Sequence, residues 1–187
     1  MAKSKRDQLL EVAIDLFYRN GCHTTGIDHL LAEAGVAKMT LYSHFKSKDD
    51  LILAAAERVH ERQIEQLEAV RQDPELSFEQ QLHAVFDELE TFVNSPDFAG
   101  CPFHNLAVEF KDPKHPVRQL SAKHKQEVER RVVDALRGGG AKQPEAVARR
   151  IMLLVEGAKA MVQVTGDHAY VDEARAAGRD LLMESLK

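Results

Sequence analysis

The chain has 187 residues, of which 44% are hydrophobic and 29% are charged, and its formal net charge is −5 at pH 7. This composition is ordinary for a soluble globular protein, and the length allows one or two domains. No apolar run approaches the length of a membrane span and the first residues lack the apolar segment of a secretion signal, so we expect a cytoplasmic protein that does not bind a membrane.

The charge is distributed unevenly along the chain. Residues 1–48 contain seven Lys or Arg and five Asp or Glu, a net charge of +2, so the remaining residues carry −7. A basic first quarter and an acidic remainder favour one docking orientation on an anionic partner such as DNA.

Apolar residues recur at intervals of three and four through most of the chain, and no segment alternates as a strand does. We therefore predict an all-α protein of about nine helices. Ser47 and Ser77 are predicted to cap the fourth and fifth of them, Ser77 in a capping box. The nine helices are expected at about residues 5–19, 27–34, within 35–48, then 48–72, 78–93, 102–111, 117–136, 144–165 and 171–186.

The second and third of these helices form a predicted helix-turn-helix motif. Gly35 permits the sharp turn between them. When the following residues are wound as a helix, Leu41 and Phe45 lie on one side, while Met39 and Ser43 lie opposite. The outer face carries hydroxyl, phenol, imidazole and ammonium groups around a methionine, a set of groups that contacts phosphates and base edges. We interpret this stretch as a DNA-recognition helix.

Between Thr25 and Lys48 the chain contains Ala34-Gly35-Val36, Thr40-Leu41-Tyr42, His44-Phe45 and Ser47-Lys48-Asp49. Together these motifs resemble the DNA-binding domain of the TetR (tetracycline repressor) family of bacterial transcriptional regulators. The resemblance implies a three-helix DNA-binding head at residues 1–48, followed by a helical ligand-binding and dimerisation body at residues 49–187. It further implies a double-stranded DNA operator and a small-molecule effector as partners.

Two residues depart from the family pattern. Leu31 stands where alanine is usual, and Ala37 stands where serine is common at the start of the recognition helix. The chain therefore lacks a capping hydroxyl that contributes ~1 kcal/mol to helix stability. Thr25 is expected to cap the second helix and to lie near a phosphate.

The DNA contacts divide into two expected groups. The candidates for base edges are Lys38, Met39, Thr40 and Ser43. The candidates for phosphates are Thr25, Tyr42, His44 and Lys48.

The body has apolar stripes that indicate either core packing or a pocket, and the sequence leaves both open. Three phenylalanines on the fifth helix favour a small hydrophobic or aromatic ligand. The hypothetical pocket comprises Phe78, Leu82, Phe86, Phe103, His104, Leu106, Val155 and Met161.

Cys22 and Cys101 are the two cysteines, too few for a disulfide framework. Three interpretations of Cys101 are open. It is a small buried hydrophobe, a thiol sensor near a helix N-terminus, or a chemical group that acts as a nucleophile with His104 or as a metal ligand with His104 and His115. A single Cys-x-x-His unit is a weak signal for a metal site. We therefore expect no catalytic residues, no metal and no cofactor, and not an enzyme.

The last two helices are apolar and rich in Gly and Ala, so they are predicted to pack closely, and the family resemblance implies that they form a homodimer interface. A dimer also doubles the base contacts available on a palindromic site. The sequence thus predicts a homodimeric DNA-binding regulator, a repressor released from its operator by a small ligand. The alternatives are a thiol-sensing regulator acting through Cys101 and a Cys/His enzyme with a regulatory head.

Overall fold

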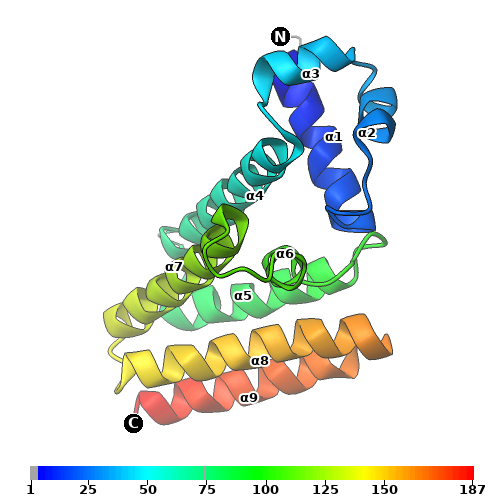
Figure 1. The fold of residues 1–187 in the computed structure, drawn as a ribbon. Coiled ribbons are helices and arrows are strands. Elements are labelled where there is room, and N and C mark those ends of the chain that lie inside the picture. The colour runs from blue at the N-terminus through cyan, green and yellow to red at the C-terminus, as the bar shows by residue number, and fades with distance from the viewer. Residues whose placement is uncertain (1–3, 74) are drawn as a thin grey trace. The chain divides into compact units, whose positions relative to one another are not determined.

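The computed structural model describes residues 4–73 and 75–187, and within this part of the chain it is entirely helical apart from turns and loops. Figure 1 shows the helices in chain order. None of them is both long enough and apolar enough to cross a membrane. They are α1 (Lys5–Asn20), α2 (Ile27–Ala34), α3 (Lys38–His44), α4 (Lys48–Arg71), α5 (Phe78–Val93), α6 (Pro102–Glu109), α7 (Pro116–Gly138), α8 (Pro144–Thr165) and α9 (Ala169–Ser185). The predicted all-α fold of about nine helices is confirmed over the part of the chain that the structure describes.

The chain forms two compact units. The first contains the described residues up to Arg62 together with Pro102–Lys123, and the second contains Gln63–Cys101 and His124–Lys187. Helices α4 and α7 each contribute residues to both units, whereas α6 belongs to the first alone. The first unit is therefore built from two separate stretches of sequence.

The core of the first unit joins α1, α2 and α3 to the start of α4. Leu9, Leu30 and Leu41 are fully buried, one from each of the first three helices. These residues lie on the apolar faces that the helical periodicity predicts. Phe110 and Val117, which follow α6, are buried in the same cluster.

Local capping explains several helix boundaries. Ser77 forms the predicted capping box with Gln80, and the Ser47 hydroxyl accepts a hydrogen bond from the Asp50 N–H at 3.1 Å. At Gly35 the backbone is left-handed, with φ 58°, which a glycine adopts without strain between α2 and α3. Ala37 precedes α3 without a side-chain cap, as predicted.

The predicted cap at Thr25 is wrong. The residue preceding α2 is Gly26, and no side chain caps this helix. Thr25 is instead buried, with 2% of its surface exposed, and its hydroxyl donates to the Gly21 carbonyl at 2.8 Å. The hydroxyl stabilises the turn between α1 and α2 because a buried donor needs a partner inside the protein.

The second unit has its own core, formed mainly by α5, α8 and α9. Phe86, Ile151 and Leu182 are almost fully buried there, one from each helix. Gly178 of α9 lies so close to the Phe86 ring that a side chain at this position would collide with it. Helices α8 and α9 run side by side (Figure 1).

Candidate nucleic-acid interface and effector site

Helix α3 presents a polar face around one exposed methionine. Leu41 is fully buried and fixes the helix on α1 and α2, whereas Met39 is 86% exposed. Tyr42, Ser43 and His44 are exposed as well. The structure therefore brings most of the predicted α3 contact residues to one accessible surface.

Two further residues of α3 have partners within the motif. The Ser43 hydroxyl donates to the Thr40 carbonyl at 2.7 Å, so its oxygen keeps a lone pair for an external donor. Lys38 Nζ lies 3.4 Å from the Asp28 carboxylate of α2. Asp28 was not among the sequence-predicted site residues, although its place in the first turn of a helix-turn-helix could have identified it.

Two of the predicted phosphate contacts, Lys48 and Thr25, are engaged at the turn between α1 and α2. Lys48 donates from Nζ to the His23 carbonyl at 3.3 Å, so it binds the α1–α2 turn. Thr25 is buried and its hydroxyl is engaged inside the turn, so its side chain offers no surface to a phosphate. The Arg6 guanidinium, which the sequence analysis missed, lies 5.2 Å from the centre of the Phe45 ring beside α3.

A small apolar cavity lies inside the second unit. Its volume is about 40 Å³, well below the ~150 Å³ in which a benzene-sized ligand fits. An aromatic effector would therefore have to displace neighbouring side chains. The lining residues come from α4, α5, α7 and α8: Leu67, Val70, Arg71, Phe78, Gln81, Val85, Val132, Ala135, Leu136 and Ile151.

The residues predicted to form the pocket are not brought together around this cavity. Phe78 lines it, whereas Phe86 and Val155 are buried in the core and Met161 is partly exposed. The side chain of Leu82 lies outside the described residues. The other three predicted residues belong to the first unit. There Phe103 is buried, Leu106 packs against the core and His104 is exposed.

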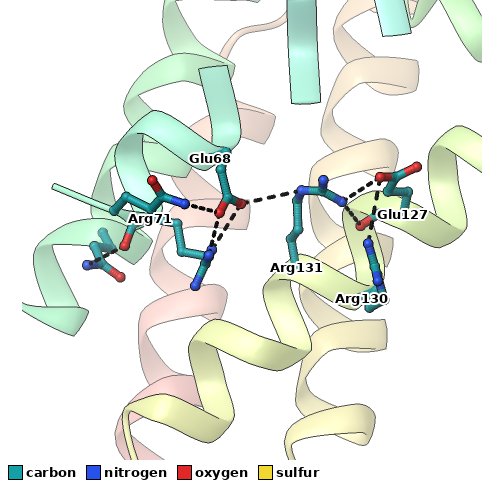
Figure 2. A network of polar contacts seen from close by, with 7 residues as sticks. Glu68, Arg71, Glu127, Arg130 and Arg131 are labelled. Carbon is teal, nitrogen blue, oxygen red and sulfur yellow. Dashed lines mark hydrogen bonds and ion pairs between the residues drawn. The ribbon is translucent and has the colours of Figure 1, made fainter. Parts of the chain in front are cut away.

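A charged network lies beside the cavity, where Glu68 is held between Arg71 and Arg131 (Figure 2). Arg71 Nε donates to Glu68 Oε2 at 3.0 Å, and Arg131 Nε lies 3.5 Å from the same oxygen. The hydrogen bond from Arg71 is the main cause that lowers the pKa of Glu68 to about 2. The pair between Glu68 and Arg131 links α4 to α7, and Arg131 also donates to Glu127 within α7.

Cys101 directly precedes α6 and has a charged neighbour. It is 6% exposed, and its sulfur accepts a hydrogen bond from Lys125 Nζ at 3.1 Å. Lys125 also pairs with Glu156 at 2.6 Å, and Glu156 pairs with Lys159 at 3.1 Å. Within residues 4–73 and 75–187, no group of three His, Cys, Asp or Glu residues is arranged to hold a metal ion.

The outer surface of α8 and α9 is apolar. Leu153 and Val164 are strongly exposed on α8, and Tyr170, Met183 and Leu186 are exposed further along the chain. A shallow hollow in this surface has an apolar floor and a charged rim. It is lined by Arg150, Leu153, Leu154, Ala177, Asp180, Leu181 and Glu184. Large exposed apolar side chains on neighbouring helices are typical of surfaces that bind another protein.

Comparison with known proteins agrees with both halves of the chain. Residues 9–60 match the model of bacterial regulatory proteins of the tetR family, and residues 79–178 match a tetracyclin repressor-like C-terminal domain. The crystal structure of a TetR-family transcriptional regulator from Streptomyces coelicolor is 32% identical and superposes with a TM-score of 0.90, covering 98% of this chain and 96% of that one.

Two curated relatives are similar over different lengths. The HTH-type transcriptional activator FasR of Mycolicibacterium smegmatis is 44% identical over 54 residues, which is 29% of this chain and only 25% of FasR. The HTH-type transcriptional regulator YjdC of Escherichia coli is 26% identical over 95% of this chain and 93% of its own length. Since both family models match and a solved member aligns over nearly the whole length, the chain belongs to the TetR family of bacterial transcriptional regulators, which bind DNA through a helix-turn-helix.

Proposed function

We propose that the protein is a homodimeric repressor that binds a palindromic operator and is released from it by a small hydrophobic or aromatic effector. The observation that carries this proposal is the exposed face of α3, where Met39 and Tyr42 project from a helix whose opposite side is anchored by buried Leu41. Such a helix fits the major groove, while the preceding helix crosses the DNA backbone.

The contacts divide by chemistry. Met39 offers an apolar group to a thymine methyl, and Lys38, Thr40 and Ser43 offer hydrogen bonds to base edges. Tyr42, His44 and Lys48 remain the candidates for phosphates, and the carboxylate of Asp28 partly neutralises the charge of Lys38.

The proposed dimer forms through α8 and α9. Their exposed aliphatic surface, which includes Leu153 and Val164, needs a cover, and the charged rim formed by Arg150, Asp180 and Glu184 can pair across a two-fold axis. A second copy of the chain covers the apolar surface and provides the partners for these charged residues. Dimerisation places two α3 helices on successive half-sites, which gives the specificity that one head lacks.

The proposed effector site is the apolar cavity lined by Phe78 and its neighbours in the second unit. A ligand that opens this cavity changes DNA affinity only by its differential affinity for the DNA-bound and free conformations. Because α4 contributes Leu67 and Val70 to the lining and also starts beside the recognition helix, it connects the cavity to the DNA-binding unit along the chain.

The test is selection of randomised duplex DNA by the purified full-length protein, followed by titration of the enriched duplex at fixed salt. We expect an inverted repeat that wild type binds tightly. Tyr42→Ala should weaken binding about tenfold or more, whereas Tyr42→Phe, which keeps the ring and loses the hydroxyl, should lose less. No enrichment above random duplex would contradict the proposal, and an unaffected Tyr42→Ala would contradict the docking arrangement.

A second candidate is regulation through the Cys101 thiol, whose sulfur accepts a hydrogen bond from the Lys125 ammonium at 3.1 Å. Addition of the thiol to the β-carbon of an α,β-unsaturated carbonyl breaks the S–H bond and forms an S–C bond, and the proton from the thiol ends on the α-carbon. N-ethylmaleimide should then lower operator affinity in wild type and leave Cys101→Ser unaffected. An alkylated protein with unchanged affinity would remove this candidate.

A further inference from the structure

The end of α6 contacts the turn between α1 and α2. Glu109, the last residue of α6, accepts hydrogen bonds from the N–H groups of two consecutive turn residues. Its Oε1 atom lies 3.0 Å from the Cys22 nitrogen, and its Oε2 atom lies 2.9 Å from the His23 nitrogen. Both N–H groups lie outside any helix, so the carboxylate supplies the partners that the turn needs. Two charge-assisted hydrogen bonds from one carboxylate fix the turn more firmly than neutral contacts do.

The backbone of the turn is shaped to receive this carboxylate. Gly21 has φ 83°, a conformation that favours glycine, and a Cβ atom at this position would lie 3.3 Å from Glu109 Oε1. The glycine that ends α1 therefore also allows the carboxylate to lie directly against the chain. Burial, aided by the negative charge of Glu109, raises the pKa of the Cys22 thiol to about 12.

Aromatic rings extend the same contact toward α4. Phe110 is buried next to Glu109, and its ring centre lies 5.0 Å from that of His23 and 4.5 Å from that of His115. His115 Nδ1 accepts a hydrogen bond from the Val117 N–H, so the proton resides on Nε2, which faces the Asp49 carboxylate at 3.9 Å. The segment after α6 thus contacts both the turn and the first residues of α4.

The turn held by Glu109 leads directly into α2. Lys48 binds the same turn from α4 by donating to the His23 carbonyl. Helix α2 begins at Ile27 with no side-chain cap, so no capping side chain occupies its first N–H groups, which are the groups that bind phosphate at a helix N-terminus. The position of the turn therefore sets the position of these N–H groups.

We propose that Glu109 is a positioning residue for DNA binding: its carboxylate fixes the α1–α2 turn and so sets where the first turn of α2 meets the DNA backbone. The inference rests on the DNA docking described under the proposed function. It makes operator affinity depend on a side chain that lies 86 residues beyond the turn in sequence.

The sign of the effect separates this role from a simple surface charge. DNA repels carboxylates, so removing an acidic side chain near the DNA-binding unit should strengthen binding slightly if the charge alone matters. A positioning role for Glu109 predicts weaker binding instead. Glu109→Asp keeps the charge but shortens the side chain by one methylene, and any loss in that variant comes from geometry.

The experiment compares full-length Glu109→Asp and Glu109→Gln with Asp112→Asn. Asp112 is a matched control because its carboxylate accepts from the Lys114 N–H in the loop just after α6. Affinity for the duplex selected by wild type is measured where circular dichroism shows every variant to be folded, together with amide hydrogen exchange at Cys22 and His23. Both Glu109 variants should bind about tenfold more weakly and exchange faster at these two amides, while Asp112→Asn should bind equally well or slightly more tightly.

Three results would overturn the inference. The first is unchanged affinity in the Glu109 variants despite faster exchange at Cys22 and His23, and the second is an equal loss in Asp112→Asn. If neither Glu109 variant folds, amide exchange in the wild-type protein is measured instead, and the Cys22 and His23 amides should stay protected in the DNA complex. Loss of this protection on DNA binding is the third result that would overturn the inference. Failure of wild type to select any duplex would instead refute the proposed function, and this inference with it.

Discussion

The ammonium group of Lys38 lies 3.4 Å from the carboxylate of Asp28, which joins the recognition helix α3 to α2. Both side chains are mostly exposed, so the pair contributes little to stability. The pair instead affects DNA binding, because the negative charge of Asp28 partly neutralises Lys38 on the proposed DNA-binding surface.

Asp28→Asn should therefore tighten DNA binding without changing the thermal unfolding temperature. The freed Lys38 is expected to make the slope of log K against log salt steeper by about one unit. Fluorescence anisotropy at several salt concentrations measures this slope. Asp15→Asn is the control, because Asp15 pairs with Arg19 within α1. Equal tightening in both variants would indicate a general charge effect.

Met39→Ala should lower operator affinity and relax specificity at one base pair of each half-site. The side chain is 86% exposed, so thermal unfolding should be unchanged. Loss of one base contact corresponds to ~1–3 kcal/mol, or about tenfold and upward in affinity. Repeating the duplex selection with the variant locates the position, and Met39→Leu should retain the preference because it keeps an apolar tip. A variant that selects the wild-type sequence with undiminished affinity would exclude a base contact.

Leu153→Glu should convert the proposed dimer to a monomer and greatly weaken operator binding. Leu153 is 74% exposed in the hollow on α8, so a charge there does not disturb the core but opposes burial against a second copy. Sedimentation velocity reports the oligomeric state. The matched control is Val108→Glu, an exposed aliphatic residue on α6 in the other unit, which should remain dimeric. A dimeric Leu153→Glu would show that the copies meet elsewhere.

Glu156 should make stability depend on pH in the acidic range. Burial raises the pKa of its carboxyl group, but the ammonium groups of Lys159 and Lys125 outweigh this effect and lower the pKa to about 2. Because this value lies below the ordinary 4.5, the ionised group stabilises the fold above about pH 4.5, and this contribution is lost as the pH falls toward 2.

At pH 7, Glu156→Gln should therefore lower the free energy of unfolding by about 3 kcal/mol, since it leaves two lysines without their partner. Urea titrations from pH 7 to pH 2 should show the difference from wild type shrinking between pH 4.5 and 2. Glu173→Gln, an exposed glutamate on α9, should show no such difference. A gap that stays constant with pH would contradict the assignment.

Helix positions followed from the sequence because their signals are local. The pattern predicted a helix over 144–165, and α8 spans Pro144–Thr165. The Ser77 capping box could also be predicted from the sequence, since Ser77 and Gln80 are only three residues apart. Helical periodicity extended this to the exposed face of α3, because a helix that buries Leu41 turns Met39 away from the core.

The rest depends on contacts between distant segments. Nothing near Glu109 indicates that its carboxylate binds the turn at Cys22, and nothing near Thr25 distinguishes a helix cap from a buried turn hydroxyl. Periodicity identified Phe78, Leu67 and Ile151 as apolar positions of their own helices. It did not show that they line one cavity, because four helices contribute to that lining. Side-chain orientation within a packed bundle is set by all of its helices together.

The composition of the first unit bears on how hybrid regulators should be assembled. Because Pro102–Lys123 packs with the described residues up to Arg62, an exchange of N-terminal segments alone would pair a new turn with the old Glu109. A chimaera that transfers both stretches would keep the Glu109 carboxylate, the Gly21 backbone against which it lies and the Phe110 ring together. Retargeting this protein to another operator therefore requires a transplant of two pieces of chain.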